Sequence, residues 1–225
     1  NCKFRAITKG RPSVVDDNEP KHLAEAALKL NLKHVVITSV TRDDLKDGGA
    51  SQFAKCIDEI RKVLQKSSIE VLIPDFKANR EALDIVIKSR PEIVNHNVET
   101  VPSLYKAVRP MANYKQSLDV LKYIKERDNK IYTKSGIMLG LGEKEDEVLK
   151  LFDDLVAIKC DMLTIGQYLP PSYQHASLKE YVSPEIFEEY KQLALKKGFK
   201  YVASGPYVRS SYNALEGIKE LRDKI

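Results

Sequence analysis

Polar and glycine-rich segments follow the stretches of this sequence that predict β-strands. These segments are residues 38–50, 95–100, 134–143, 166–168 and 204–212. In a (β/α) barrel such segments meet at the carboxyl ends of the strands, where active sites form. Their amide and carboxylate groups can bind hydroxyl groups, and a lysine there can bind a carboxylate or attack a carbonyl carbon. The pattern therefore favours a functional site at this end of the fold.

The elements that must position these segments alternate along the chain. Short runs rich in β-branched residues predict strands at 34–40, 69–74, 92–97, 130–134, 162–165 and 200–203. Helix-period apolar stripes lie between them, and one helix is expected to begin after Ser183 and end at Gly198. Repeated strand–helix units predict a parallel sheet with right-handed crossovers. A partial or complete (β/α) barrel and an open doubly wound sheet both satisfy this pattern, in one domain over residues 1–225.

Composition excludes several classes of protein. The chain has 225 residues, of which 43% are hydrophobic and 31% charged, as in a folded domain. No apolar run approaches the roughly 18 residues of a membrane span. A net charge of +5 without basic blocks argues against nucleic-acid binding and fits a mild preference for an acidic partner. The start at Asn1, with neither Met nor a signal sequence, suggests a piece of a longer protein.

The three cysteines are Cys2, Cys56 and Cys160. Their odd number and wide spacing argue against a disulfide framework and favour a reducing compartment. Cys56 falls in an apolar helical stripe and Cys160 just before a predicted strand, so we expect both in the core. No His/Cys spacing indicates a zinc site.

A collinear set of motifs resembles the lipoyl synthase family. It comprises NCKF, VVITSVTRDDLKDGGA, IEVLIPDF, NHNVET, VRP, TKSGIMLGLGE, LTIGQYLPPS, YVSPEIF and ASGPYVRSSYNA, and it runs from the first residue to about Ala214. Each motif alone is weak, but the ordered set is specific.

The resemblance implies a fold, cofactors and partners. The fold would be a partial (β/α)6 barrel of the radical S-adenosylmethionine (SAM) kind, with its first strand upstream of this chain. The cofactors would be SAM and two [4Fe-4S] clusters, used to insert two sulfurs at C6 and C8 of a protein-bound octanoyl group. The partners would be an octanoylated lipoyl carrier domain or glycine cleavage H protein, and ferredoxin or flavodoxin as electron donor. We expect a cytoplasmic monomer, or a mitochondrial or plastid protein in a eukaryote.

The cluster ligands expected from the resemblance are incomplete in this chain. Cys2 matches the middle cysteine of the family's Cys-x3-Cys-x2-Cys motif, and Arg5 occupies the third position. A guanidinium has no lone pair to give to iron, so it cannot replace a thiolate. The auxiliary cluster's cysteines would lie upstream, and its serine ligand would be Ser210 or Ser211, with a slight preference for Ser211. Arg5 indicates either a degenerate enzyme or one substitution in an otherwise ordinary one.

The resemblance also implies SAM contacts at strand ends. Asn97 and Glu99 would bind the ribose hydroxyls, although turn or helix-cap chemistry is an equal alternative. His96 should point to the opposite face of the strand and serve in packing.

Five further residues are candidates for the cofactor site. Lys134 and Ser135, placed at a strand end, would contact the SAM carboxylate or a substrate carbonyl, unless Lys134 is a solvated cation. Gly140 belongs to an element that packs the adenine, or it serves a plain strand-to-helix turn. Thr38 and Ser39 lie where the family's loop approaches the methionine end of SAM.

Three functions satisfy these observations. The first is a lipoyl synthase core. The second is a Schiff-base lyase on a (β/α) barrel, with Lys134 as the nucleophile. The third is a cluster-free protein that still binds lipoyl carrier domains, which the guanidinium at Arg5 favours.

Overall fold

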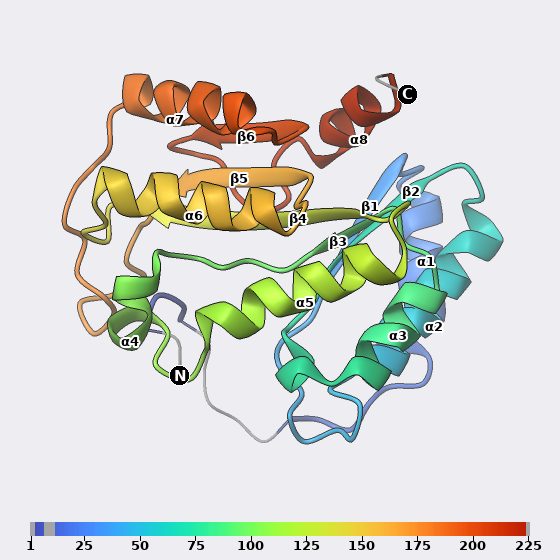
Figure 1. Ribbon diagram of the computed structural model, residues 1–225. Coiled ribbons are helices and arrows are strands. Elements are labelled where there is room, and N and C mark those ends of the chain that lie inside the picture. Colours follow the sequence, from blue (N-terminus) through green and yellow to red (C-terminus); the bar gives the residue numbers. More distant parts are fainter. Residues whose placement is uncertain (1–2, 7–11, 224–225) are drawn as a thin grey trace.

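The centre of the computed structural model, which describes residues 3–6 and 12–223, is a curved sheet of six parallel strands (Figure 1). The strands are β1 (His34–Thr38), β2 (Ser68–Leu72), β3 (Ile93–Asn95), β4 (Tyr132–Leu139), β5 (Met162–Gln167) and β6 (Tyr201–Gly205). They lie in the order β1-β2-β3-β4-β5-β6. Because each strand pairs with the next one along the chain, right-handed crossovers put the connecting helices on one face. The sheet is not closed, and this arrangement confirms a partial (β/α) barrel; the further upstream strand stays a prediction.

The helices follow the expected apolar stripes. They are α1 (Glu19–Lys29), α2 (Ala50–Val63), α3 (Arg80–Lys88), α4 (Tyr105–Val108), α5 (Tyr114–Arg127), α6 (Glu145–Ala157), α7 (Pro184–Lys197) and α8 (Ala214–Asp223), with short 3₁₀ turns η1 (Phe76–Ala78) and η2 (Pro102–Leu104). The hydroxyl of Ser183 accepts from the backbone N–H of Ile186, and Gly198 ends α7 at φ 121°. These bounds confirm the helix expected between Ser183 and Gly198. Within the described ranges, no helix is long and apolar enough to cross a membrane.

Strand β4 differs most from the sequence prediction. It continues to Leu139 instead of ending at Lys134, because β5 pairs with it as far as Leu139 opposite Gln167. Residues 136–139, at the start of the glycine-rich run, are therefore strand, and the turn begins only at Gly140. The placement of Lys134 and Ser135 at a strand end was wrong, since both lie within β4. The sequence also missed α4 and both 3₁₀ turns, which are too short to show a helical period.

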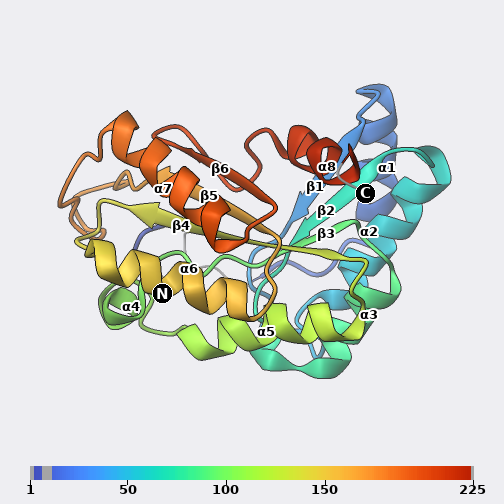
Figure 2. The same cartoon turned by 45° about the horizontal axis from the view of Figure 1, so that its top comes forward.

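Apolar side chains pack between the sheet and the helices that cover it. Helices α1–α3 cover β1–β3 through one cluster that includes Phe53, Ile57 and Ile69, and α6 and α7 cover β4–β6 through another that includes Phe152 and Phe187. Helix α8 contacts both β6 and β1, which are the two edge strands of the open sheet. Figure 2 shows α8 beside this opening. The terminal helix therefore covers the gap that the incomplete barrel leaves.

A buried ion pair lies inside the curved sheet. Lys134 Nζ is 2.8 Å from Oε1 of Glu70, and their side chains are 1% and 0% exposed. Asn95 donates to the same oxygen, and His34 Nε2 lies 3.5 Å from Oε2. Burial opposes ionisation of Glu70, but the nearby His34 ring and the charge and hydrogen bond of Lys134 outweigh it and lower the pKa of this carboxyl. The pair therefore holds Lys134 as a structural cation and not as a free nucleophile.

Replacing Lys134 should reveal the cost of an unpaired buried charge. Lys134→Met leaves Glu70 buried without its cation, and we expect a loss of about 3–5 kcal/mol in the free energy of unfolding. Urea denaturation followed by circular dichroism measures this loss. The double variant Lys134→Met/Glu70→Leu should recover most of it, and the exposed control Lys130→Met should stay close to the wild type. A single variant as stable as that control would contradict the ion pair.

Candidate functional site

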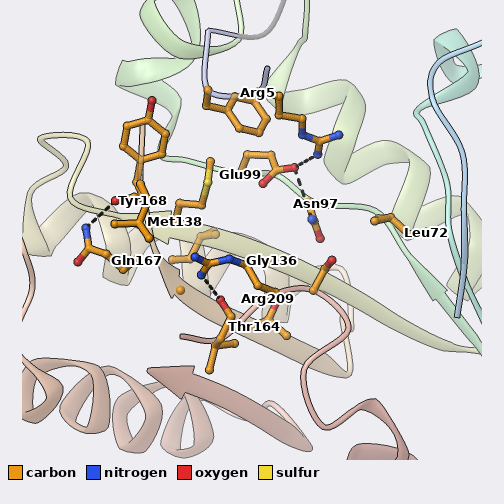
Figure 3. Close-up of a pocket in the computed structure, with 16 residues that line it drawn as sticks. Arg5, Leu72, Asn97, Glu99, Gly136, Met138, Thr164, Gln167, Tyr168 and Arg209 are labelled. Carbon is orange, nitrogen blue, oxygen red and sulfur yellow. Dashed lines mark hydrogen bonds and ion pairs between the residues drawn. The ribbon is translucent and has the colours of Figure 1, made fainter. Parts of the chain in front are cut away.

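A pocket of about 340 Å³ lies inside the curved sheet at the carboxyl ends of its strands (Figure 3). Strands β2, β4 and β5 contribute Leu72, Gly136 and Thr164 to its lining. The N-terminal residues Phe4 and Arg5 also line it. The pocket therefore forms at the end of the fold where the polar segments were expected to meet.

The segment after β3 brings two polar side chains to this pocket. Glu99 adopts φ 68°, and its backbone N–H donates to the carbonyl of Gly136 while its carbonyl accepts from the N–H of Met138, both at 2.9 Å. Arg109 Nη1 donates to the carbonyls of Asn97 and Val98 at 3.2 and 3.0 Å. A left-handed conformation costs a side-chain-bearing residue about 1 kcal/mol or more, so these contacts must hold it in place. Together they fix Asn97 and Glu99 against β4.

Asn97 and Glu99 present hydrogen-bond acceptors to the pocket. The side-chain amide of Asn97 donates to Oε1 of Glu99 at 3.4 Å, and its buried Oδ1 has no partner among the described residues. The side chain of Glu99 is only 7% exposed and forms an ion pair with Arg5 Nη2. A buried acceptor without a partner is costly unless a ligand or water donates to it. The pair is therefore suited to hydroxyl or ammonium donors.

Two glycines let backbone and side chains approach closely. A Cβ on Gly136 would lie 2.6 Å from Thr164 Oγ1 and 2.9 Å from Asn97 Oδ1. A Cβ on Gly166 would lie 2.3 Å from the carbonyl oxygen of Val208. Any larger residue at either position would push into the pocket wall. The bare backbone of β4 and β5 therefore sets the shape of the pocket.

The loop after β6 closes another side. Arg209 and Ser210 line the pocket, and Arg209 Nη1 donates to the carbonyl of Val208 at 2.7 Å. Ser211 is exposed and is not among the lining residues. The structure thus brings Ser210, and not Ser211, to the same pocket as Asn97 and Glu99. Which serine meets an auxiliary cluster stays a prediction.

The other sequence candidates lie outside the pocket lining. Thr38 and Ser39 are exposed where β1 ends, and the hydroxyl of Ser39 donates to the carbonyl of Val40. The hydroxyl of Ser135 is fully buried and donates to the carbonyl of His96. Gly140, at φ 95°, forms the turn that ends β4. Their contacts with SAM stay predictions.

His96 has the packing role that the sequence predicted. Its Nδ1 donates to the carbonyl of Ile73, and its Nε2 lies 3.0 Å from the hydroxyl of Ser117. Burial lowers the pKa of His96, so the ring stays neutral. This histidine braces β3 against α5 and does not face the pocket.

Several lining residues were not named singly as candidates, although all but Phe4 and Thr164 lie in the segments expected to form the site. These are Phe4, Met138, Thr164, Gly166, Gln167, Tyr168 and Arg209. Alternation along β4 and β5 was the usable signal, because Gly136 pairs with Thr164 and Met138 with Gly166 on one face. Because the predicted strand ended at Lys134, the register from which this alternation could be read was not available.

The cysteines lie apart from the pocket where the structure describes them. Cys56 and Cys160 are buried in the helix–sheet layers, as expected. Burial raises the pKa of Cys56 to about 11 and that of Cys160 to about 12, which disfavours the thiolate that binds iron. Cys2 lies outside the described residues. Among the residues that are described, no group of three His, Cys, Asp or Glu side chains is placed to hold a metal ion.

Comparison with known proteins decides the family. The model of the radical SAM superfamily matches residues 2–155. Lipoyl synthase of Caldanaerobacter subterraneus subsp. tengcongensis is 56% identical over 222 residues, which cover 99% of this chain and 78% of that protein. Lipoyl synthase of Aquifex aeolicus is 51% identical, over 96% of this chain and 79% of that protein. The chain belongs to the lipoyl synthase family. It is therefore a radical SAM sulfurtransferase by family.

Solved structures agree with this lipoyl synthase fold. Methylornithine synthase matches 99% of the chain and 77% of its own length with a TM-score of 0.65 at 12% identity. The hydrogenase maturase HydG matches 98% of the chain and 51% of its own length with a TM-score of 0.70 at 13% identity. At such low identity these likenesses show the fold alone.

The family implies SAM and an iron–sulfur cluster, and the described residues fit only the first. Asn97 Oδ1 and Glu99 offer acceptors to ribose hydroxyls, and Gly136 lets Asn97 lie close against the backbone of β4. For the cluster, position 5 carries a guanidinium that is paired with Glu99, and the described cysteines are buried elsewhere. The described lining thus offers acceptors that suit SAM, and a guanidinium stands at the position where the family's motif has a thiolate.

A methyl group on Gly166 should disturb the pocket specifically. Gly166→Ala places its Cβ against the Val208 carbonyl and must displace the loop that carries Arg209. We expect at least tenfold weaker binding of S-adenosylhomocysteine, measured by isothermal titration calorimetry. Gly205→Ala is the matched control, because its Cβ meets only Val208 Cγ2 at 3.6 Å. Equal affinities of the two folded variants would contradict the described loop position.

Proposed function

We propose that this chain is the core of a lipoyl synthase built to insert two sulfurs at C6 and C8 of a protein-bound octanoyl group, with SAM in the pocket beside Asn97 and Glu99. Collinear identity of 51–56% with lipoyl synthases over nearly the whole chain supports the assignment. The observation that carries it is the unpartnered Oδ1 of Asn97 next to the Glu99 carboxylate, at the carboxyl ends of the strands.

The chain's own residues have distinct roles in this proposal. SAM, when bound, supplies the adenosyl group by which this superfamily activates C–H bonds. Asn97 and Glu99 would orient its ribose by accepting hydroxyl hydrogens. Met138, Tyr168 and Leu169 form an apolar part of the wall, suited to an aliphatic chain. The protein thus contributes orientation and exclusion of water, and no acid–base group is needed.

Arg5 limits what this chain does as written. Its guanidinium cannot supply the thiolate that the family's motif has at this position. We propose that the chain keeps the scaffold and the SAM pocket of the family but does not assemble the cluster at its rim. Sulfur insertion then requires a cysteine at position 5.

Partners of the core follow from its family and its charge. We propose an octanoylated lipoyl carrier domain or glycine cleavage H protein as the protein substrate. The net charge of +5 supports electrostatic steering of an acidic carrier. A ferredoxin or flavodoxin remains the expected electron donor for a variant that holds its clusters.

A second candidate is a protein that binds carrier domains without chemistry, and the Arg5–Glu99 ion pair favours it. In this case an octanoylated carrier domain would bind to the chain with Arg5 and to its Arg5→Cys variant alike, but neither would cleave SAM. The Schiff-base lyase is not retained. Lys134 is buried against Glu70 and does not reach the pocket.

Reconstitution of the full-length protein tests the leading proposal. Anaerobic treatment with iron and sulfide, followed by iron counting and a 5′-deoxyadenosine assay, should give no SAM cleavage with Arg5 in place. Arg5→Cys should add one cluster and restore cleavage, because the missing thiolate is supplied. Arg5→Ser removes the guanidinium without adding a thiolate and should behave like the parent. Full cluster content and SAM cleavage with Arg5 present would contradict the claim that position 5 must supply a thiolate.

A further inference from the structure

Most N–H groups of the Arg5 guanidinium have no hydrogen-bond acceptor among the described residues. One N–H, on Nη2, meets Glu99, and the group lies over the Phe4 ring with 5.0 Å to its centroid. An arginine has five N–H donors, and among the described residues only this one acceptor meets it. The side chain is 45% exposed at the rim of the pocket. Several donors therefore remain for a ligand.

The charges on the pocket lining do not balance. Arg5 and Arg209 both line it, and each brings a guanidinium cation. Glu99 is the carboxylate of the described lining, so two fixed cations face one anion. Figure 3 shows Arg5 next to Glu99, with Arg209 across the cavity. A carboxylate group on a ligand can therefore pair locally with a guanidinium of this lining.

The acceptors of the pocket define the remainder of such a ligand. Asn97 Oδ1 is buried without a partner, and Glu99 shares one oxygen with Arg5 and the Asn97 amide. These oxygens need hydroxyl or ammonium donors. The complementary molecule carries a carboxylate at one end and hydroxyl donors at the other. An adenosyl amino acid has this combination.

We propose that Arg5 binds the carboxylate of the amino-acid part of SAM, so that this chain binds adenosyl amino acids with no iron present. A planar guanidinium accommodates a carboxylate through two parallel N–H···O bonds while a further N–H keeps its contact with Glu99. The cation at position 5 is thus a binding group, and not only a lost ligand. This inference rests on the proposed assignment of the pocket to SAM.

Calorimetry on iron-free full-length protein tests the proposal with two stable probes. S-adenosylhomocysteine carries the amino-acid carboxylate, whereas methylthioadenosine keeps the nucleoside and lacks it. We expect the first to bind at least tenfold more tightly than the second. Arg5→Gln should abolish that preference and leave methylthioadenosine binding unchanged. Arg5→Lys should keep only part of the preference, because an ammonium lacks the bidentate fork.

A matched control separates this contact from general electrostatics. Lys3 is an exposed cation on the same segment, and Lys3→Gln removes the same charge without touching the pocket lining. It should keep the full preference, and thermal unfolding should show that both variants remain folded. A preference that survives Arg5→Gln, or that Lys3→Gln also removes, overturns the proposal.

The same titrations keep the two proposals apart. Equal affinity for both probes in the parent protein rejects the carboxylate contact but leaves the nucleoside pocket standing. Failure of methylthioadenosine to bind, together with failure of S-adenosylhomocysteine, rejects the assignment of the pocket to SAM itself.

Discussion

The pairing of the segment after β3 with strand β4 is the constraint on which the site depends. Glu99 exchanges backbone hydrogen bonds with Gly136 and Met138, although β3 itself ends at Asn95. This contact requires a positive φ at Glu99, and Arg109 holds the preceding carbonyls. Without it, the Glu99 carboxylate would have no fixed place in the pocket. The side-chain amide of Asn97 and the guanidinium of Arg5 both donate to that carboxylate.

Side chains on one face of β4 alternate with those on the other, and two neighbours on the same face have different roles. Lys134 and Gly136 lie on the same face of the sheet but two residues apart, so one is buried below the pocket and the other lines it. The Lys134–Glu70 pair gives this lower layer a fixed polar floor. In the layer above, Gly136 lets Thr164 and Asn97 approach the backbone of β4 closely. Lys134, which the sequence offered as a possible nucleophile, therefore has a structural role.

Local pattern predicted most of the fold but only a few residues of the site. The six strands and the long helices follow from β-branched runs and apolar stripes, and Asn97 and Glu99 were found because they follow a strand end. The continuation of β4 past Lys134 was not predictable from local pattern, because β5 pairs with Gly136 and fixes it as strand. The positive φ of Glu99 has a similar origin, since tertiary hydrogen bonds impose it on a residue with no such preference.

Arg5 takes no part in the backbone contacts that shape the pocket. Its ion pair with Glu99 joins a half-exposed guanidinium to a carboxylate that is 7% exposed, so it is intermediate between a surface pair and a buried one. By contrast, the contacts that shape the pocket are backbone hydrogen bonds and close approaches at Gly136 and Gly166, and none of them involves Arg5. The scaffold therefore tolerates a thiolate or a guanidinium at position 5. The residue there decides which chemistry the pocket supports, and the fold supplies the pocket in either case.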